Sequence, residues 1–122
     1  MLELPLSDFE YVITSDKTIA LTRYKGFHQY INLAIPKSYN VSGEELPVTI
    51  IGPECFAYNS LLERVQLPEG LKEIRSSAFF NSNLKSINLP TSLRTIEDYA
   101  FIPLKTAFSS LFFVKYLLLN KI

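Results

Sequence analysis

The sequence contains very few of the residues that most catalytic and metal sites require. Its 122 residues include one cysteine and one histidine. One cysteine cannot form a disulfide within the chain, and one cysteine with one histidine supplies too few ligands for a zinc site. The four glycines show neither the G-x-G spacing of a dinucleotide site nor a Walker-type loop. We therefore expect no catalytic residue, no metal and no cofactor, and we do not expect an enzyme.

Charge of one sign does not predominate either. Twelve basic and twelve acidic residues cancel, so no overall field favours nucleic acid or an anionic membrane. The N-terminal residues lack the basic and then apolar segments of a signal peptide. Near the C-terminus, the longest uncharged apolar-rich stretch is 106–114, far shorter than the roughly 20 residues of a membrane-spanning helix. We expect no nucleic-acid partner and no membrane span, and the cellular location stays open.

What the sequence does contain is a repeat of one short pattern. Three segments share the order Ile-x-x-x-small-Phe, namely Ile51–Phe56, Ile74–Phe79 and Ile96–Phe101. Their phenylalanines follow one another at intervals of 23 and 22 positions. The residues between copies follow Leu-x-x-(Val/Ile)-x-Leu-Pro-x-x-Leu-x-x-Ile. A period of this length predicts a solenoid forming one domain, in which each coil packs on its neighbours.

Each position of the pattern has a physical meaning. The alternation in Val/Ile-x-Leu predicts a half-buried strand, and Pro68 and Pro90 end that strand because proline cannot donate to a ladder. Ala78 and Ala100 are small, as a tight corner inside a stack requires. The large side chains expected between successive coils, in one column, are Phe56, Phe79 and Phe101.

The pattern extends upstream with two additions. Residues 11–14 and 18–24 are β-type runs around a short turn, which predicts a hairpin that covers the exposed end of the first coil. Residues 37–47 lengthen one coil and contain Asn, Ser, Gly and Pro, so we expect a surface loop there. We therefore divide the chain into an N-terminal hairpin cap, a solenoid of about three coils and an apolar tail, at residues 1–26, 27–103 and 104–122.

These spaced residues resemble the BspA-like, or treponemal-type, leucine-rich repeat family. The resemblance covers about residues 9–101. Two departures stand out, because the cysteine that usually follows Ala-Phe is missing from both complete copies and the repeat does not continue after Phe101. The residues that carry the resemblance are Ile51-Gly52, Cys55-Phe56, Leu62, Val65, Leu67-Pro68, Leu71, Ile74, Ala78-Phe79, Leu84, Ile87, Leu89-Pro90, Leu93, Ile96 and Ala100-Phe101.

The resemblance implies a leucine-rich-repeat solenoid, mainly β with short turns or 3-10 segments. It also implies a non-catalytic protein-binding module of the surface or secreted recognition and adhesion type, whose protein ligand the sequence does not identify. The open face of the stacked strands is the expected binding surface, with an ordinary solvated face as the alternative. Three rungs fall short of the roughly 800 Å² per partner of a standard interface, so we expect weak affinity. The candidate residues on this face are Asn32, Arg64, Gln66, Ser86 and Asn88.

Other notable residues have simpler interpretations. Cys55 occupies the position that Ala78 and Ala100 fill in later copies, so a small buried core residue is expected rather than a nucleophile. Nothing in the spacing brings His28 to Cys55, as a Cys–His pair would require. Residues 40–42, Asn-Val-Ser, form a glycosylation sequon in the predicted loop, which matters only in a eukaryotic secretory route.

The tail, residues 104–122, has apolar residues at helical spacing and also on the opposite face. We expect a helical segment with three possible roles. It could cap the last coil, form a contact for a partner or a second copy, or lie on a membrane surface. The second role leads to the alternative function, a structural fragment that self-associates through the tail.

Overall fold

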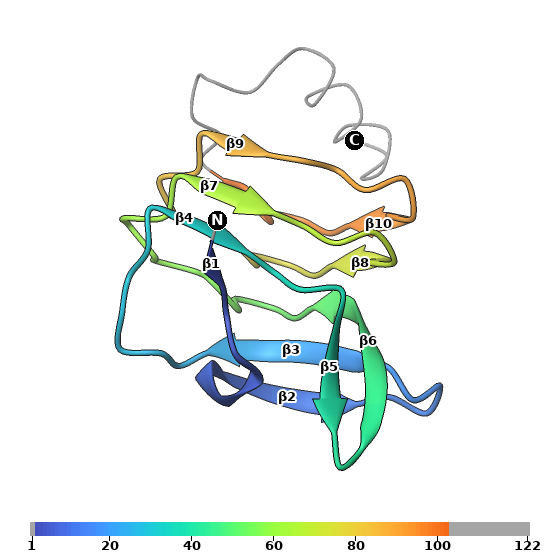
Figure 1. Cartoon of the computed structure of the whole chain (residues 1–122). Coiled ribbons are helices and arrows are strands. Elements are labelled where there is room, and N and C mark those ends of the chain that lie inside the picture. Colours follow the sequence, from blue (N-terminus) through green and yellow to red (C-terminus); the bar gives the residue numbers. More distant parts are fainter. Residues whose placement is uncertain (1, 103–122) are drawn as a thin grey trace.

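The chain winds into stacked coils with parallel strands on two sides (Figure 1). The computed structural model describes residues 2–102, so the predicted tail helix lies outside the described residues. One sheet has the order β1 (Leu2–Glu3), β4 (Asn32–Ala34), β7 (Arg64–Gln66), β9 (Ser86–Ile87). The other has the order β10 (Thr95–Ile96), β8 (Glu73–Ile74), β6 (Glu44–Ile51), β3 (Ile19–Tyr24), β2 (Phe9–Ile13), with β5 (Ser38–Val41) paired to β6.

The repeat spacing produces this stacking directly. Val65 pairs in parallel register with Leu33 on one side and with Ile87 on the other. Along β7 the middle residue is buried and both neighbours are exposed, which is the alternation of a half-buried strand. One copy of the repeat therefore makes one turn of the coil, and the predicted leucine-rich-repeat solenoid is confirmed. Within residues 2–102 the only helical element is the 3-10 turn η1 (Leu6–Asp8).

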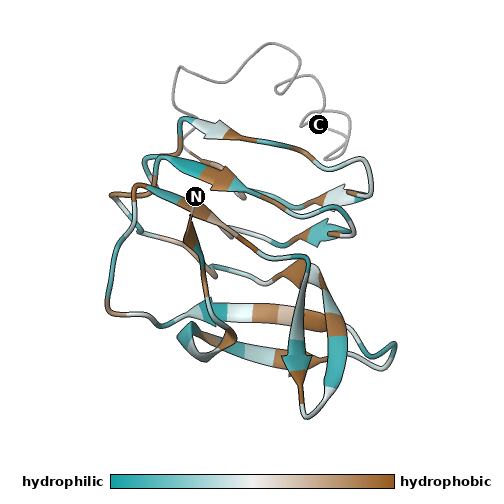
Figure 2. Cartoon of the chain, in the orientation of Figure 1, coloured by the Kyte–Doolittle hydropathy of each residue, from teal (hydrophilic) through white to brown (hydrophobic). Residues whose placement is uncertain are grey.

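Aromatic rings form a continuous column through the coils. The Phe56 and Phe79 rings stack with centroids 5.3 Å apart, and the Phe79 and Phe101 rings stack at 5.5 Å. Tyr24 continues the column at 5.6 Å from Phe56, with Phe9 packed edge-on against both. The predicted column is confirmed and is longer than expected. Along the sheets, apolar residues alternate with polar ones (Figure 2).

The corners beside the ring column hold ordinary residues in left-handed backbone conformations. Glu54, Ser77 and Tyr99 occupy equivalent places and have φ values of 58°, 57° and 61°. Such a conformation costs roughly 1–2 kcal/mol for a residue with a Cβ. Backbone bonds between coils offset this cost, since Glu54 N donates to Ser76 O and Ser77 N donates to Asp98 O, both at 3.1 Å. The geometry of the coil therefore overrides local preference.

The segment expected as a surface loop, residues 37–47, is instead largely an antiparallel hairpin. β5 pairs with the first half of β6 from Ser38 opposite Pro47 to Val41 opposite Glu44. Ser42 and Gly43 form the turn with φ values of 52° and 91°, the two positive angles that a tight two-residue hairpin needs. Tyr39 and Leu46 are buried. Their apolar side chains explain why this segment folds onto the core.

The N-terminal hairpin of β2 and β3 is present, as predicted, and it is integrated into the larger sheet. β3 pairs in parallel with the second half of β6, which pairs with β8. β1 was not expected. It pairs with β4 in the other sheet, and the Tyr39 hydroxyl donates to the Leu4 carbonyl at 2.6 Å just after it. The first residues of the chain therefore form part of both sides of the coil.

Candidate binding face

The outward face of the sheet β1-β4-β7-β9 carries the predicted site residues. Asn32, Arg64 and Ser86 lie side by side in parallel register, and all three are exposed. The Arg64 guanidinium donates to the Asn32 amide oxygen at 3.3 Å. The structure thus brings these three predicted residues together in one row, and the bond between neighbouring strands restrains the arginine, the longest side chain of the row.

The other two predicted residues, Gln66 and Asn88, lie in a second row, which is less uniform. Gln66 is exposed and points outward, whereas Ala34 beside it is buried. Asn88 is exposed but its amide is engaged, because its oxygen accepts from Leu67 N at 2.7 Å and its nitrogen donates to Leu67 O at 2.9 Å. The amide replaces the backbone partner that Leu67 lacks once β9 has ended at Ile87. Asn88 is therefore a surface residue whose amide also bonds the backbone of the neighbouring coil.

Sequence reasoning missed one member of this face. β1 places Glu3 in register with Ala34, in the row that contains Gln66. The alternation of Leu2, Glu3 and Leu4 is a strand signal too short to be distinctive. Glu3, Lys37, Gln66 and Asn88 line a depression of about 590 Å³ that opens at this side of the sheet. Both charge signs thus border the face.

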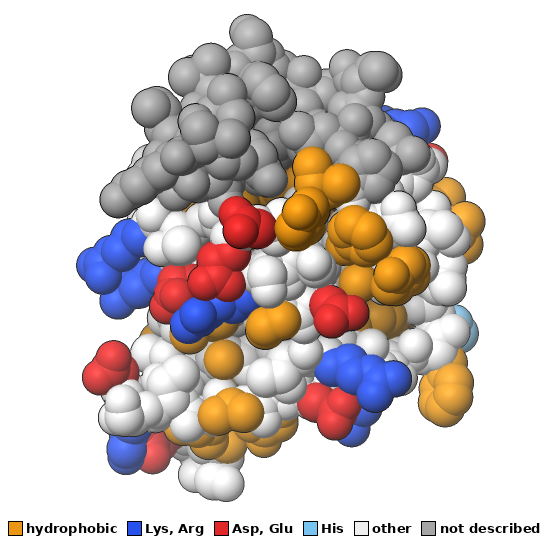
Figure 3. Space-filling model, turned by 180° about the vertical axis from the view of Figure 1, so that it is seen from behind, with side chains coloured by type: hydrophobic (Ala, Val, Ile, Leu, Met, Phe, Trp, Pro, Cys, Tyr) orange, Lys and Arg blue, Asp and Glu red, His pale blue; other side chains and the backbone are white. Residues whose placement is uncertain are grey.

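Several charged groups elsewhere on the surface form ion pairs with one another. From behind, acidic and basic side chains lie side by side (Figure 3). On the second sheet, the Arg75 guanidinium lies 3.1 Å from Glu73 and 3.4 Å from Glu97. Beside the candidate face, the Lys85 ammonium lies 3.5 Å from Glu63. These partly exposed pairs are each worth less than about 1 kcal/mol, so their effect is to balance the surface charge.

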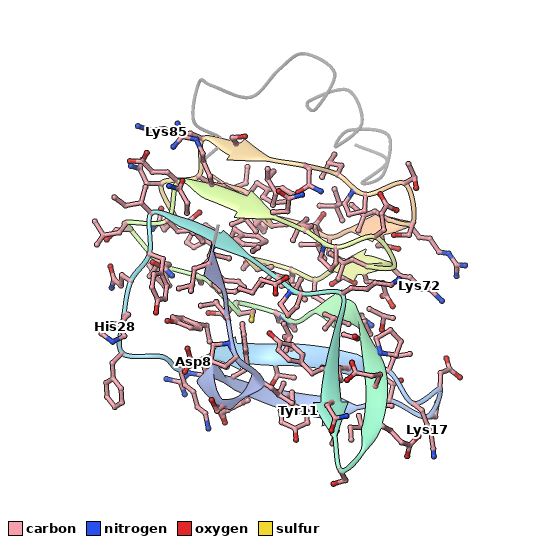
Figure 4. All side chains as sticks on the ribbon, in the orientation of Figure 1. Asp8, Tyr11, Lys17, His28, Lys72 and Lys85 are labelled. Atoms are coloured by element: carbon pink, nitrogen blue, oxygen red, sulfur yellow. The ribbon has the colours of Figure 1, made fainter. Side chains whose placement is uncertain are left out.

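Among the described residues, Cys55 and His28 are the other candidates for chemistry. Cys55 is buried at 3% exposure, as predicted, and burial raises the pKa of its thiol to about 12. A thiol with so high a pKa stays protonated and is a poor nucleophile at neutral pH. His28 lies in the exposed connection before β4 (Figure 4). Among residues 2–102 there is no group of three potential metal ligands and no helix that could cross a membrane.

Known proteins share this architecture. The profile of a family described as a BspA type leucine rich repeat region, in six copies, matches residues 31–107. A leucine-rich repeat protein of T. pallidum is similar at 35% identity with a TM-score of 0.71, over 81% of this chain and 44% of that one. A leucine-rich repeat protein of Bacteroides capillosus is similar at 29% identity with a TM-score of 0.71, over 80% and 72%.

A leucine rich cell surface protein of Faecalibacterium prausnitzii is also similar, at 29% identity with a TM-score of 0.69, over 77% of this chain and 26% of that one. The chain therefore spans less than half the length of the T. pallidum protein and about a quarter of the F. prausnitzii protein. No curated protein sequence matches.

Proposed function

This chain belongs to the BspA-type leucine-rich repeat family, and we propose that it is a non-catalytic protein-binding module that uses the outward face of β1-β4-β7-β9. Solenoids of this kind present an extended surface on which other proteins bind. The observation that carries the proposal is the row of exposed polar residues held in register on stacked parallel strands, at Asn32, Arg64 and Ser86.

The face suits binding because its backbone is held before a partner arrives. The strands pair in register over three or four rungs, and Arg64 is oriented by Asn32. A partner therefore loses less free energy to the ordering of side chains than it would on a mobile loop. Arginine is enriched among residues that dominate interface energies. We therefore assign the main polar contacts to Arg64 and Gln66, and a supporting role to Asn88.

The size of the face sets the expected strength. The described strands on this side are two or three residues long, so we expect the face to be smaller than the roughly 800 Å² per partner of a standard interface. We therefore place the affinity in the micromolar range or weaker, on the order of 10 μM. Longer arrays of the same coil would extend this surface.

We further propose a cell-surface or secreted location and a recognition or adhesion role. The support is the similarity to the F. prausnitzii protein, which is described as a cell surface protein, together with the family resemblance. Protease treatment of intact source cells tests the location, since an exposed protein is digested while a cytoplasmic marker survives. Survival of this chain alongside that marker would contradict the proposed location.

Replacement of the central polar residues tests the binding face. The immobilised chain is used to capture proteins, and each captured protein is titrated against Arg64→Ala/Gln66→Ala. The matched control is Arg94→Ala, which removes another exposed arginine, from the other side of the coil. We expect the double variant to weaken binding at least about tenfold and the control to leave it unchanged. Equal affinities for the double variant, the control and the parent would refute the assignment of this face.

A further inference from the structure

Within the described part of the chain, the strand β2 leaves one edge of the larger sheet unpaired. It ends the order β10-β8-β6-β3-β2, and β3 is its only partner strand among residues 2–102. It lies at the opposite end of the stack from β9 and β10 (Figure 1). An edge of this kind can template pairing with another strand, and natural edges are usually protected by lysine, proline or a bulge. β2 contains neither lysine nor proline, and its bulge lies before Tyr11.

Three consecutive apolar side chains on this edge are accessible. Tyr11 is 39% exposed, Val12 is 55% exposed and Ile13 is 45% exposed. Tyr11 and Ile13 are opposite Leu21 and Ile19, which are fully buried. Tyr11 and Ile13 therefore extend the apolar face of the sheet beyond the buried residues of β3. Figure 4 shows Tyr11 at the lower end of the molecule.

The backbone groups of Tyr11 and Ile13 point toward the free edge. Thr14 N donates to Thr18 O at 2.8 Å, which marks a hydrogen-bonded pair at the turn. Antiparallel pairs alternate, so Val12 and Ala20 form the next hydrogen-bonded pair and the residues on either side of Val12 face outward. The hydrogen bonding on the other side of β3 is consistent with this alternation. Leu21 lies opposite Tyr11, and its carbonyl accepts from Gly52 N, away from β2, at 2.7 Å.

We infer that two copies of this chain associate by antiparallel pairing of their β2 strands about a two-fold axis at Val12. A two-fold interface must be self-complementary, and this register is. It places Tyr11 opposite Ile13 of the second copy, Val12 opposite Val12, and Glu10 opposite Thr14. The pairs are aromatic with β-branched and β-branched with β-branched, which are favourable across strands, and no like charges are opposed within the paired residues 10–14. Glu10 keeps its contact with Arg23 of its own chain, at 3.7 Å.

The geometry also limits the interface. The turn of the β5–β6 hairpin reaches the same end of the molecule, where Glu44 lies 3.6 Å from Lys17. Pairing is thereby confined to about five residues of each copy, so we expect a dissociation constant on the order of 100 μM. Asn32, Arg64 and Gln66 lie in the other sheet. The inference therefore stands independently of the proposed ligand face.

Amide hydrogen exchange of the full chain tests the register. From about 10 μM to about 1 mM protein, the amides of Tyr11 and Ile13 should gain protection, because only a second strand bonds them. The Val12 amide, already bonded to β3, should not change and serves as the internal control. Unchanged exchange at Tyr11 and Ile13 across this range would overturn the proposal, as would protection of the two amides that is independent of concentration.

Charge placed at the two-fold axis gives a second test. Val12→Lys and Val12→Glu each oppose two like charges, so each should weaken self-association at least about tenfold in sedimentation velocity. Mixing the two variants should restore dimers, since unlike charges then meet. Leu61→Lys, on an equally exposed aliphatic residue elsewhere, should behave as the parent. Self-association that survives Val12→Lys would assign it to another surface, such as residues 104–122, and sink the β2 pairing.

Discussion

The Phe56 and Phe79 rings stack with centroids 5.3 Å apart and an angle of 5° between their planes. They lie one coil apart, and the backbone bond from Phe56 N to Ala78 O, at 2.7 Å, fixes that spacing. Each ring is almost wholly buried. The contact joins two neighbouring copies of the repeat, so the column transmits stability along the stack rather than within one coil.

The column should dominate the stability of the fold. Phe79 contacts rings on both sides, so Phe79→Ala opens a cavity between three coils. We expect the free energy of unfolding to fall by about 3–5 kcal/mol, measured by urea denaturation. Phe80→Ala, which changes the partly exposed neighbour that packs on Tyr58, is the matched control and should cost much less. Equal losses would mean that the column is not the main support.

Asn88 should contribute to stability through the Leu67 backbone. Asn88→Ala leaves the partly buried N–H and C=O of Leu67 without their partners, so we expect a loss of about 1–3 kcal/mol in the free energy of unfolding. Ser86→Ala, an exposed change on the same face, should stay within about 0.5 kcal/mol. Thermal denaturation of the two variants separates a scaffold role from a surface role, and similar melting temperatures would argue against the former.

Tyr39 should hold the first strand in place. Tyr39→Phe removes the hydroxyl that donates to the Leu4 carbonyl at 2.6 Å, at an expected cost of about 1 kcal/mol. Because Leu4 N donates to Ala34 O, its amide should then exchange faster while the amides of β7 remain protected. Unaltered exchange at Leu4 would show that β1 is held by its strand pairing alone. Burial also raises the pKa of the Tyr39 hydroxyl well above its usual range.

Cys55 should make stability depend on pH at alkaline values. Its thiol has a pKa of about 12 when folded and about 8.5 when unfolded. The folded state therefore keeps a proton that the unfolded state releases. The associated stability is fully present below about pH 8.5 and is lost as the pH rises toward 12.

The comparison variant for this effect is Cys55→Ala, because Ala78 and Ala100 fill the same position in later coils. The free energy of unfolding of this variant should be lower than that of the parent. Because only the parent loses the thiol contribution, we expect this difference to narrow by about 1 kcal/mol between pH 8.5 and 9.5. Urea denaturation at both pH values measures this. A constant difference would show that the thiol titrates normally in the folded protein.

The repeat made much of the fold accessible from the sequence. Phe56, Phe79 and Phe101 recur at nearly one interval, and equivalent residues of a solenoid must stack, so their column followed from spacing. Cys55 was assigned to the core because it replaces an alanine. The hairpin at 37–47 was not foreseen, since its Asn, Ser and Gly indicate a turn but do not show that Tyr39 and Leu46 find a core to enter.

The candidate face was accessible only in part. The period placed Asn32, Arg64 and Ser86 in one row, because residues one repeat apart occupy the same position of adjacent coils. It gave no sign that Asn88 would bond to Leu67, since an amide in a polar row looks the same whether it faces solvent or the backbone of the next coil. Glu3 was missed because a strand of two residues leaves almost no pattern.

Spacing alone predicted the coils, their stacking and the burial of their apolar residues, since these contacts recur at one interval along the chain. The roles of β1, the β5–β6 hairpin and the β2 edge depended on contacts between residues that share no period, such as Tyr39 with Leu4. A periodic contact repeats its signal in every copy. A contact made once between distant segments depends on where the folded backbone brings them.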